Sequence, residues 1–182
     1  TVRSFDPKIL TGAIPAFAIM DEIHVMVSYS YATRVLGQIR GGMVTNESSL
    51  LIMITTQSEE PPQGIFESEL QDARAIRDGI ITENVRMLPV MWEFPEDFQK
   101  AKGSPWQDVK NWPLVLPNAG RSITVERLIP DFEKAQRTSA EELARWASQH
   151  LNIQIGMGHH LSQWIGAAYW LQAADPEYDL DA

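Results

Sequence analysis

The 182-residue chain has a formal net charge of −9, 44% hydrophobic residues and 21% charged residues. These values predict an ordinary globular domain with a core of its own, and they exclude an intrinsically disordered or fibrous chain. The chain lacks cysteine, which excludes disulfide bonds and thiolate metal sites. Because a nucleic-acid grip needs a basic stripe, this acidic chain is not expected to be the main grip on DNA.

The first half of the chain alternates short apolar runs with helical patterns. Residues 14–20 and 50–54 are continuously apolar, which is typical of parallel strands buried on both faces. Helical periodicity covers residues 28–43 and 64–79, and residues 85–92 read as a third strand. Strands that alternate with helices favour an α/β fold with a parallel sheet and right-handed crossovers.

The second half has a different texture. Residues 95–120 are irregular and rich in proline, and two short helices are expected at residues 124–136 and 139–150. A capping box of Ser139 and Glu142 begins the second helix. Residues 160–173 are expected to form either a last helix or an amphipathic strand.

This change of texture predicts two parts, a sheet core over residues 1–94 and a peripheral, mainly helical subdomain over residues 95–182. The chain begins at Thr1, so we expect it to be part of a longer polypeptide. With no apolar run of membrane-spanning length and no N-terminal leader pattern, we expect a soluble protein of the cytoplasm without a membrane partner.

The first apolar run ends on two acids, Asp21 and Glu22. An aspartate at the carboxyl end of a buried strand can hold Mg²⁺ through water, and a following glutamate can accept a proton from a water that attacks a phosphate. A strand that ends in a solvated acidic turn has the same pattern, so the pair alone leaves both interpretations open. His24 follows closely and could hydrogen-bond the acid or a substrate group, or could equally be a plain surface histidine or one that supports the site from behind.

The second apolar run ends on Thr55, Thr56 and Gln57. Small hydroxyl groups and an amide at a neighbouring strand end could contact the γ-phosphate or its water, and report hydrolysis to the rest of a motor. The same residues could simply end a strand and begin a turn. Two buried strands, separated by one helix and both ending in polar residues, are typical of helicase-like ATPases.

Several motifs in a fixed order resemble the ATPase part of the large terminase subunit of tailed phages, the group related to HK97-type packaging motors. They are Phe17-Ala18-Ile19-Met20-Asp21-Glu22-Ile23-His24, the run from Ile52 to Thr56, Gly64 at a helix start, Trp112 followed by Pro117-Asn118-Ala119-Gly120-Arg121-Ser122-Ile123, and Leu151-Asn152-Ile153. The resemblance extends from about Ile14 to Trp164.

The resemblance implies the C-terminal part of a RecA-like sheet domain (a P-loop NTPase of the ASCE type) with a small helical subdomain. It implies that Asp21 is the Walker B residue that holds Mg²⁺ and Glu22 the catalytic base. Thr55 and Thr56, followed by Gln57, would be the coupling motif. The ligands of the domain would be ATP and Mg²⁺.

The implied whole protein is a motor of the host cytoplasm that packages DNA while it is docked on the prohead, and that also cleaves concatemeric DNA. Its implied partners are double-stranded DNA, the portal protein, the small terminase subunit and further copies of itself in a ring. DNA would be held mainly by regions outside this chain.

The chain departs from this family pattern in one important respect. It has no glycine-rich phosphate loop with Lys and Ser or Thr, and Gly41-Gly42 has neither the spacing nor the lysine. The chain alone is therefore expected to be inactive. Two alternatives stay open, a related helicase-like ATPase and a non-catalytic assembly or binding module of α/β fold.

Other conspicuous residues favour structural roles. His159-His160 lacks a third metal ligand at a suitable spacing, and the alternating acids from Asp175 to Asp181 are typical of a solvated tail. Arg34 and Arg40 are expected to be surface residues rather than arginine fingers. The six tryptophans are expected to pack in cores rather than to stack on bases.

Overall fold

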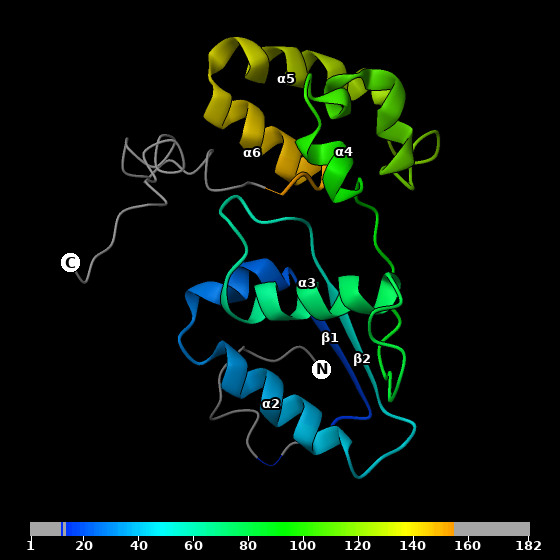
Figure 1. The fold of residues 1–182 in the computed structure, drawn as a ribbon. Coiled ribbons are helices and arrows are strands. Elements are labelled where there is room, and N and C mark those ends of the chain that lie inside the picture. Colours follow the sequence, from blue (N-terminus) through cyan, green and yellow to red (C-terminus); the bar gives the residue numbers. More distant parts are fainter. Residues whose placement is uncertain (1–11, 13, 155–182) are drawn as a thin grey trace, which may run out of the picture.

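The computed structural model describes residue 12 and residues 14–154, and it has a mixed α/β structure (Figure 1). Its elements are, in chain order, β1 (Phe17–Asp21), η1 (Ile23–Ser28), α2 (Ala32–Met43), β2 (Leu50–Ile54), α3 (Gly64–Arg77), α4 (Glu96–Lys100), η2 (Pro105–Gln107), η3 (Val109–Leu114), α5 (Val125–Thr138) and α6 (Ala140–Leu151). The interpretations of His159-His160, of residues 160–173 and of the acids from Asp175 to Asp181 concern residues outside the described part. No helix within the described part is both long enough and apolar enough to span a membrane.

β1 and β2 form a two-stranded parallel sheet in which Phe17 lies beside Leu50 and Asp21 beside Ile54. Both predicted strands are confirmed, and β2 has its predicted bounds. α2 forms the crossover between them, and it begins at Ala32 rather than Ser28 because residues 23–28 wind into the 3₁₀ helix η1. The predicted alternation of strand, helix and strand is therefore present in the first half.

The third strand predicted at residues 85–92 is wrong, because this segment lies outside any sheet. Leu88 and Val90 are 86% and 70% exposed, so the apolar run is not buried. Pro89 also lacks the N–H group that a strand ladder needs. The run crosses the surface between α3 and α4 without a partner strand in the described residues.

One face of the sheet is covered by α2 and α3. Met20 of β1 packs there with Val35 and Leu36 of α2 and with Phe66 of α3. Met20 and Phe66 are 4% and 2% exposed, so this face is well sealed. The covered side chains alternate with uncovered ones along each strand, as the two-residue period of a strand requires.

The other face of the sheet is apolar and open within the described residues. Phe17, Ile19, Leu50 and Ile54 lie on it, and each is about half exposed. Parallel sheets are normally buried on both faces, and sheets of two strands seldom stand alone. This face is therefore suited to being covered by further polypeptide.

The second half encloses a separate hydrophobic core around packed aromatic rings. Trp112 is completely buried, and its ring lies 5.0 Å from that of Phe132 and 5.1 Å from that of Trp146. Its indole N–H donates to the Trp106 carbonyl oxygen at 2.9 Å. The predicted core role is thus confirmed for these tryptophans, whereas Trp92 is 49% exposed.

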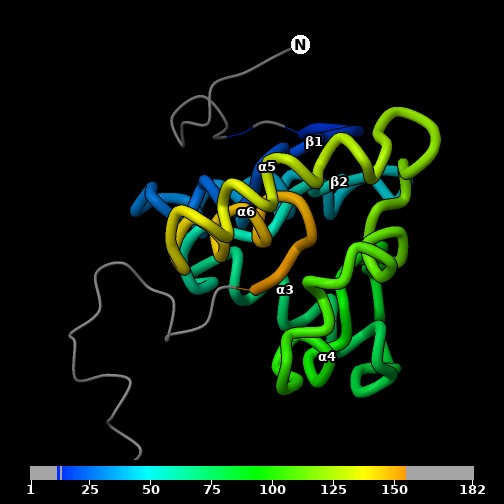
Figure 2. The backbone as a smooth tube through the Cα atoms, turned by 90° about the horizontal axis from the view of Figure 1, so that it is seen from above, coloured from blue at the N-terminus to red at the C-terminus, as the bar shows by residue number. Residues whose placement is uncertain are grey.

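α5 and α6 supply most of the helical wall of this core, and the two views show them side by side (Figures 1 and 2). Both were predicted within two residues of their bounds. The Ser139 side chain accepts a hydrogen bond from the Glu142 N–H at 3.1 Å, which confirms Ser139 as the cap. The Glu142 carboxylate contacts Arg145 instead of the Ser139 N–H, so the reciprocal half of the predicted capping box is not formed. Thr124 precedes α5 but makes no side-chain cap.

The two cores share no residue, and Glu93 lies on the chain between them. Its side chain is 7% exposed and contacts Arg74 at 2.5 Å and Arg77 at 2.6 Å, both on α3. Hydrogen bonding to Asp78, together with Glu93, holds the pKa of the Arg77 guanidinium above its ordinary value. This ion pair fixes the segment that leads from the sheet to the helical half.

Replacing Glu93 with alanine is expected to lower the free energy of unfolding by about 1–3 kcal/mol, because two partly buried guanidinium groups each lose one charged acceptor. Glu96→Ala is the matched control. Glu96 pairs with Lys100 on the surface with 76% of its side chain exposed, and loss of such a pair changes stability by less than about 1 kcal/mol. Urea denaturation of the two variants measures the difference, and equal losses would contradict a special role for Glu93.

Candidate functional site

The parallel register brings the two predicted motifs to the same edge of the sheet. Asp21 is the last residue of β1 and pairs with Ile54, the last residue of β2. Glu22 and Thr55 follow directly, so both motifs leave the sheet side by side. In open parallel sheets this carboxyl edge is where ligands bind. In Figure 1 the edge faces the helical half of the chain.

His24 joins the two motifs. Its Nδ1 lies 3.1 Å from Glu22 Oε2 and 2.9 Å from Thr55 Oγ1, and its backbone N–H donates to the same hydroxyl oxygen at 3.4 Å. The Thr55 hydroxyl donates its own proton to the Thr56 carbonyl oxygen at 2.9 Å. With the Thr55 hydroxyl proton engaged in this way, the tautomer of His24 that carries a proton on Nδ1 satisfies both contacts.

Glu22 is held through its side chain by His24 and through its backbone by the start of η1. Its backbone has φ 55° and ψ 53°, in the left-handed region that non-glycine residues seldom adopt. That conformation costs about 1–2 kcal/mol for a residue with a side chain. Its carbonyl oxygen accepts from the Val25 N–H at 2.9 Å, which begins η1. Strained backbone of this kind is concentrated at functional positions.

Asp21 lies on the open side of the sheet with its side chain exposed. Within the described residues, no hydrogen bond or ion pair occupies its carboxylate. Mg²⁺ in phosphoryl-transfer sites is usually held by one or two carboxylates, with waters and substrate phosphates as the other ligands. Asp21 and Glu22 could supply these one or two carboxylates. The described residues hold no cluster of three or more acidic or histidine ligands.

Gln57, the third predicted coupling residue, does not join this group. It is 5% exposed, and its backbone N–H donates to Asn152 Oδ1 at 3.2 Å, so it faces the helical half instead. Asn152 was not predicted to belong to the site. An asparagine directly after a periodic helix is a common C-terminal cap, and this signal could have pointed to it.

These contacts give the geometry with which known proteins can be compared. No family model, curated protein or solved structure matches the chain. The roles of Asp21, Glu22, Thr55 and Thr56 thus depend on the motif order and on the contacts described above.

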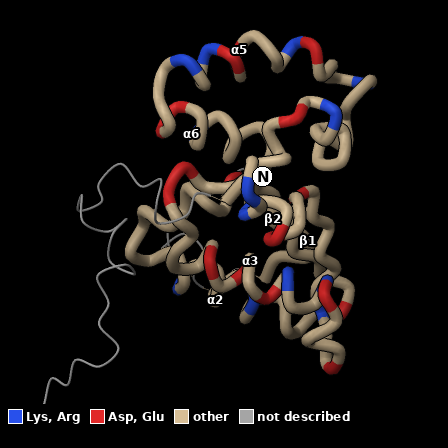
Figure 3. Tube along the Cα trace, turned by 45° about the horizontal axis from the view of Figure 1, so that its top comes forward, with Lys and Arg blue, Asp and Glu red and all other residues tan. Residues whose placement is uncertain are grey.

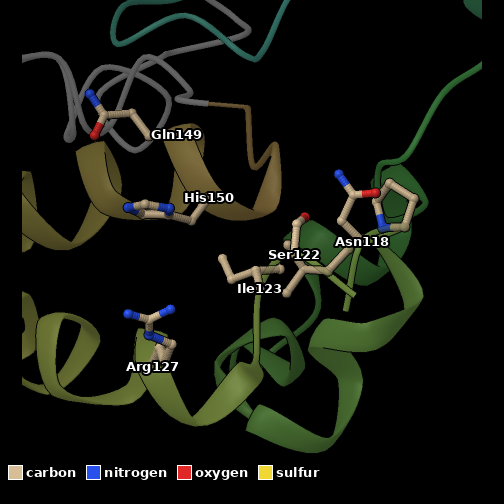
Figure 4. A pocket seen from close by; sticks show the side chains of 8 residues that line it. Asn118, Ser122, Ile123, Arg127, Gln149 and His150 are labelled. Atoms are coloured by element: carbon tan, nitrogen blue, oxygen red, sulfur yellow. The ribbon is translucent and has the colours of Figure 1, made fainter. Parts of the chain in front are cut away.

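A concave region lies in the helical half, beside residues 116–123. This open pocket has a volume of about 560 Å³ and is lined by Leu116, Pro117, Asn118, Ser122, Ile123, Arg127, Gln149 and His150 (Figure 4). Burial lowers the pKa of His150, and the carboxylate of Asp131 opposes this effect. Gln149 is already engaged, because its amide donates to Glu59 at 2.6 Å. The side chains that line the pocket differ in type from those at the acidic strand edge, and they include no pair of carboxylates.

Of the two arginines considered as fingers, Arg40 is occupied within the chain. It makes a two-pronged contact to Glu69 of α3 at 2.8 and 2.7 Å. Such planar pairs are among the stronger side-chain contacts. Arg40 thus ties α2 to α3, in agreement with the expectation that it is a structural surface residue.

Proposed function

We propose that this chain is the part of a phage DNA-packaging ATPase that carries the Walker B and coupling motifs of a RecA-like domain. The observation that carries the proposal is the His24 bridge, since it joins Glu22 at the end of β1 to Thr55 at the end of β2. An acidic strand end alone would be unremarkable. A polar bridge between two neighbouring parallel strand ends is what an enzyme needs to sense the state of a bound phosphate.

In the proposed reaction water attacks the γ-phosphorus of ATP, and the bond to the ADP oxygen breaks. Glu22 would take a proton from that water, and Asp21 would hold Mg²⁺ through water. When bound, Mg²⁺ would neutralise charge on the phosphate oxygens. His24 keeps the Glu22 carboxylate oriented, and the Thr55 hydroxyl ties this orientation to β2. The phosphate cradle itself would come from polypeptide beyond this chain.

The open face of the sheet supports the same proposal. The two-stranded parallel sheet leaves one apolar face unburied, because four of its side chains are about half exposed: Phe17, Ile19, Leu50 and Ile54. At about 25 cal/mol for each Å² of apolar surface, covering four such side chains would contribute several kcal/mol. The helices that connect further strands of a larger sheet would cover this face, and those strands would bring a phosphate loop to the carboxyl edge.

Charge distribution bears on the proposed partners. Figure 3 shows acidic and basic residues interspersed over both halves, and the described residues form no basic stripe. Double-stranded DNA would therefore be held mainly by other regions of the whole protein. The portal protein, the small terminase subunit, neighbouring copies in a ring and the docking of the motor on the prohead in the host cytoplasm belong to the same proposal, as does the separate nuclease activity.

The full-length gene product tests the proposal directly. We expect it to carry a phosphate loop upstream of Thr1, to hydrolyse ATP in the presence of DNA, and to fill purified proheads with DNA. Strand unwinding without packaging would indicate a helicase-like motor instead. A complete gene without any phosphate loop, and a product without ATP turnover, would leave a non-catalytic assembly module as the correct interpretation.

A further inference from the structure

Asn152 is placed where three separate segments meet. It ends α6 with φ 53° and ψ 31°, a left-handed conformation that asparagine tolerates better than most residues with side chains. Its backbone N–H closes the last turn by donating to the Ala147 carbonyl oxygen. The Ile153 N–H donates to the same oxygen at 3.2 Å. The backbone of Asn152 is thus a helix cap, which leaves its side chain for other contacts.

Both polar atoms of that side chain are used, and they bind two different parts of the chain. Asn152 Oδ1 accepts from the Gln57 N–H at 3.2 Å, just after β2. Asn152 Nδ2 donates to the Trp92 carbonyl oxygen at 2.9 Å, on the segment that leads into the helical half. One amide therefore links the end of β2, the connecting segment and the end of α6.

The contact to Gln57 continues the chain of contacts that begins at Glu22. From Glu22 this chain passes to His24 and then to Thr55 through contacts of 3.1 and 2.9 Å. The Thr55 hydroxyl donates to the Thr56 carbonyl oxygen. The backbone N–H that follows this carbonyl belongs to Gln57, and it donates to Asn152 Oδ1. A displacement of the β2 end would therefore reach α6 first at Asn152.

Three other polar contacts between the halves are exposed, and none of them involves Thr55, Thr56 or Gln57. Gln149 and Arg145 of α6 contact the Glu59 carboxylate at 2.6 and 3.7 Å, and Arg74 contacts Gln154 at 2.7 Å. Exposed polar pairs of this kind hold parts together weakly. Gln57, by contrast, is 5% exposed, and the hydrogen bond from its N–H to Asn152 is partly buried, so loss of the Asn152 oxygen costs more at this position.

We propose that Asn152 is the positioning residue that transmits the state of the Thr55–Gln57 strand end to α6 and the helical half. The role of this joint in a motor rests on the proposed ATPase function. The joint itself is a property of the chain and is tested without ATP. Contiguous contacts alone do not establish coupling, so the test measures coupling between two positions.

The first experiment uses NMR on this chain. Thr55→Val, which removes the hydroxyl and keeps the shape, is expected to shift the amide resonances of Gln57 and Ile153. In an Asn152→Gly background the response at Ile153 is expected to fall at least threefold. Glycine retains the left-handed cap, so the helix end is preserved while the amide is lost. An undiminished response at Ile153 would overturn the proposal.

Two further variants separate the arms of the amide. Asn152→Asp retains an oxygen for the Gln57 N–H and loses the donor to Trp92, so hydrogen exchange at Gln57 should stay near that of the unaltered chain. Asn152→Gly should accelerate that exchange at least tenfold. Gln149→Ala, which breaks an exposed contact between the halves, is the control and should leave Gln57 exchange unchanged.

The second experiment uses the full-length gene product. Asn152→Gly is expected to leave ATP turnover within twofold and to reduce the length of DNA moved per ATP at least tenfold. An unchanged length of DNA per ATP would overturn the coupling role, even where the NMR response is seen. Absence of ATP turnover in the unaltered protein would instead refute the proposed function and leave the joint to be decided by the NMR result.

Discussion

Glu22→Gln is expected to reduce ATP turnover by the full-length gene product at least 100-fold, because general-base catalysis contributes about 10²–10⁴ in rate. Glutamine has the same shape but a far weaker base in place of the carboxylate. Its amide can still contact His24, so the edge of the sheet should keep its structure. Nucleotide binding, measured by titration with a fluorescent ATP analogue, should change much less than turnover.

Folding should tolerate this substitution, since the Glu22 side chain is 51% exposed. Glu47→Gln is the control, because it makes the same change of charge at an exposed position before β2, at the opposite edge of the sheet. It should leave turnover within twofold. If Glu22→Gln retained more than a tenth of the turnover, the assignment of Glu22 as the base would be wrong, whether or not the substitution changed the stability of the fold.

Local patterns were enough to predict most elements of this fold. The two apolar runs became strands because each is short, continuous and bounded by polar residues. α3, α5 and α6 follow from apolar side chains that recur at helical spacing and from the Ser139 cap. These signals lie within a few residues of one another, so no knowledge of the tertiary structure was needed to read them.

The third strand failed because strand formation needs a partner, which a local pattern does not reveal. Residues 85–92 have the composition of a strand, but Pro89 interrupts the donors and no described strand lies beside the run. The run lies on the surface without regular secondary structure. An apolar pattern therefore predicted a strand where the described residues offer no pairing partner.

The sequence predicted the two motifs of the site, but it did not predict the contacts that join them. Proximity of Asp21, Glu22 and Thr55 follows from parallel pairing of consecutive strands, which the alternating pattern indicates. The tie through His24 depends on the turn that Glu22 makes in its left-handed conformation, and that turn has no sequence signal because glutamate rarely adopts it. The Gln57 contact with Asn152 joins residues 95 positions apart, so only the folded chain reveals it.

Trp112→Ala is expected to lower the free energy of unfolding of the helical half by about 3–5 kcal/mol, as is usual for removing a large aromatic side chain from a core. Trp112 has no exposed surface, packs edge-on against Phe132 and lies beside Trp146. The substitution also leaves the Trp106 carbonyl without its 2.9 Å donor. Because domains are stable by only about 5–15 kcal/mol, this loss should bring the helical half close to unfolding.

Hydrogen exchange can locate this loss within the chain. The two cores share no residue, so amides of α5 and α6 should lose protection in Trp112→Ala while those of α2 lose much less. Leu114→Ala, two positions along the chain at a side chain that is 66% exposed, is the control and should change stability by less than about 0.5 kcal/mol. Equal loss of protection in both halves would mean that they unfold as one unit. In that case the polar contacts around Glu93 and Asn152 would hold the halves together more strongly than exposed pairs do, and Asn152 could not act as a joint between parts that move separately.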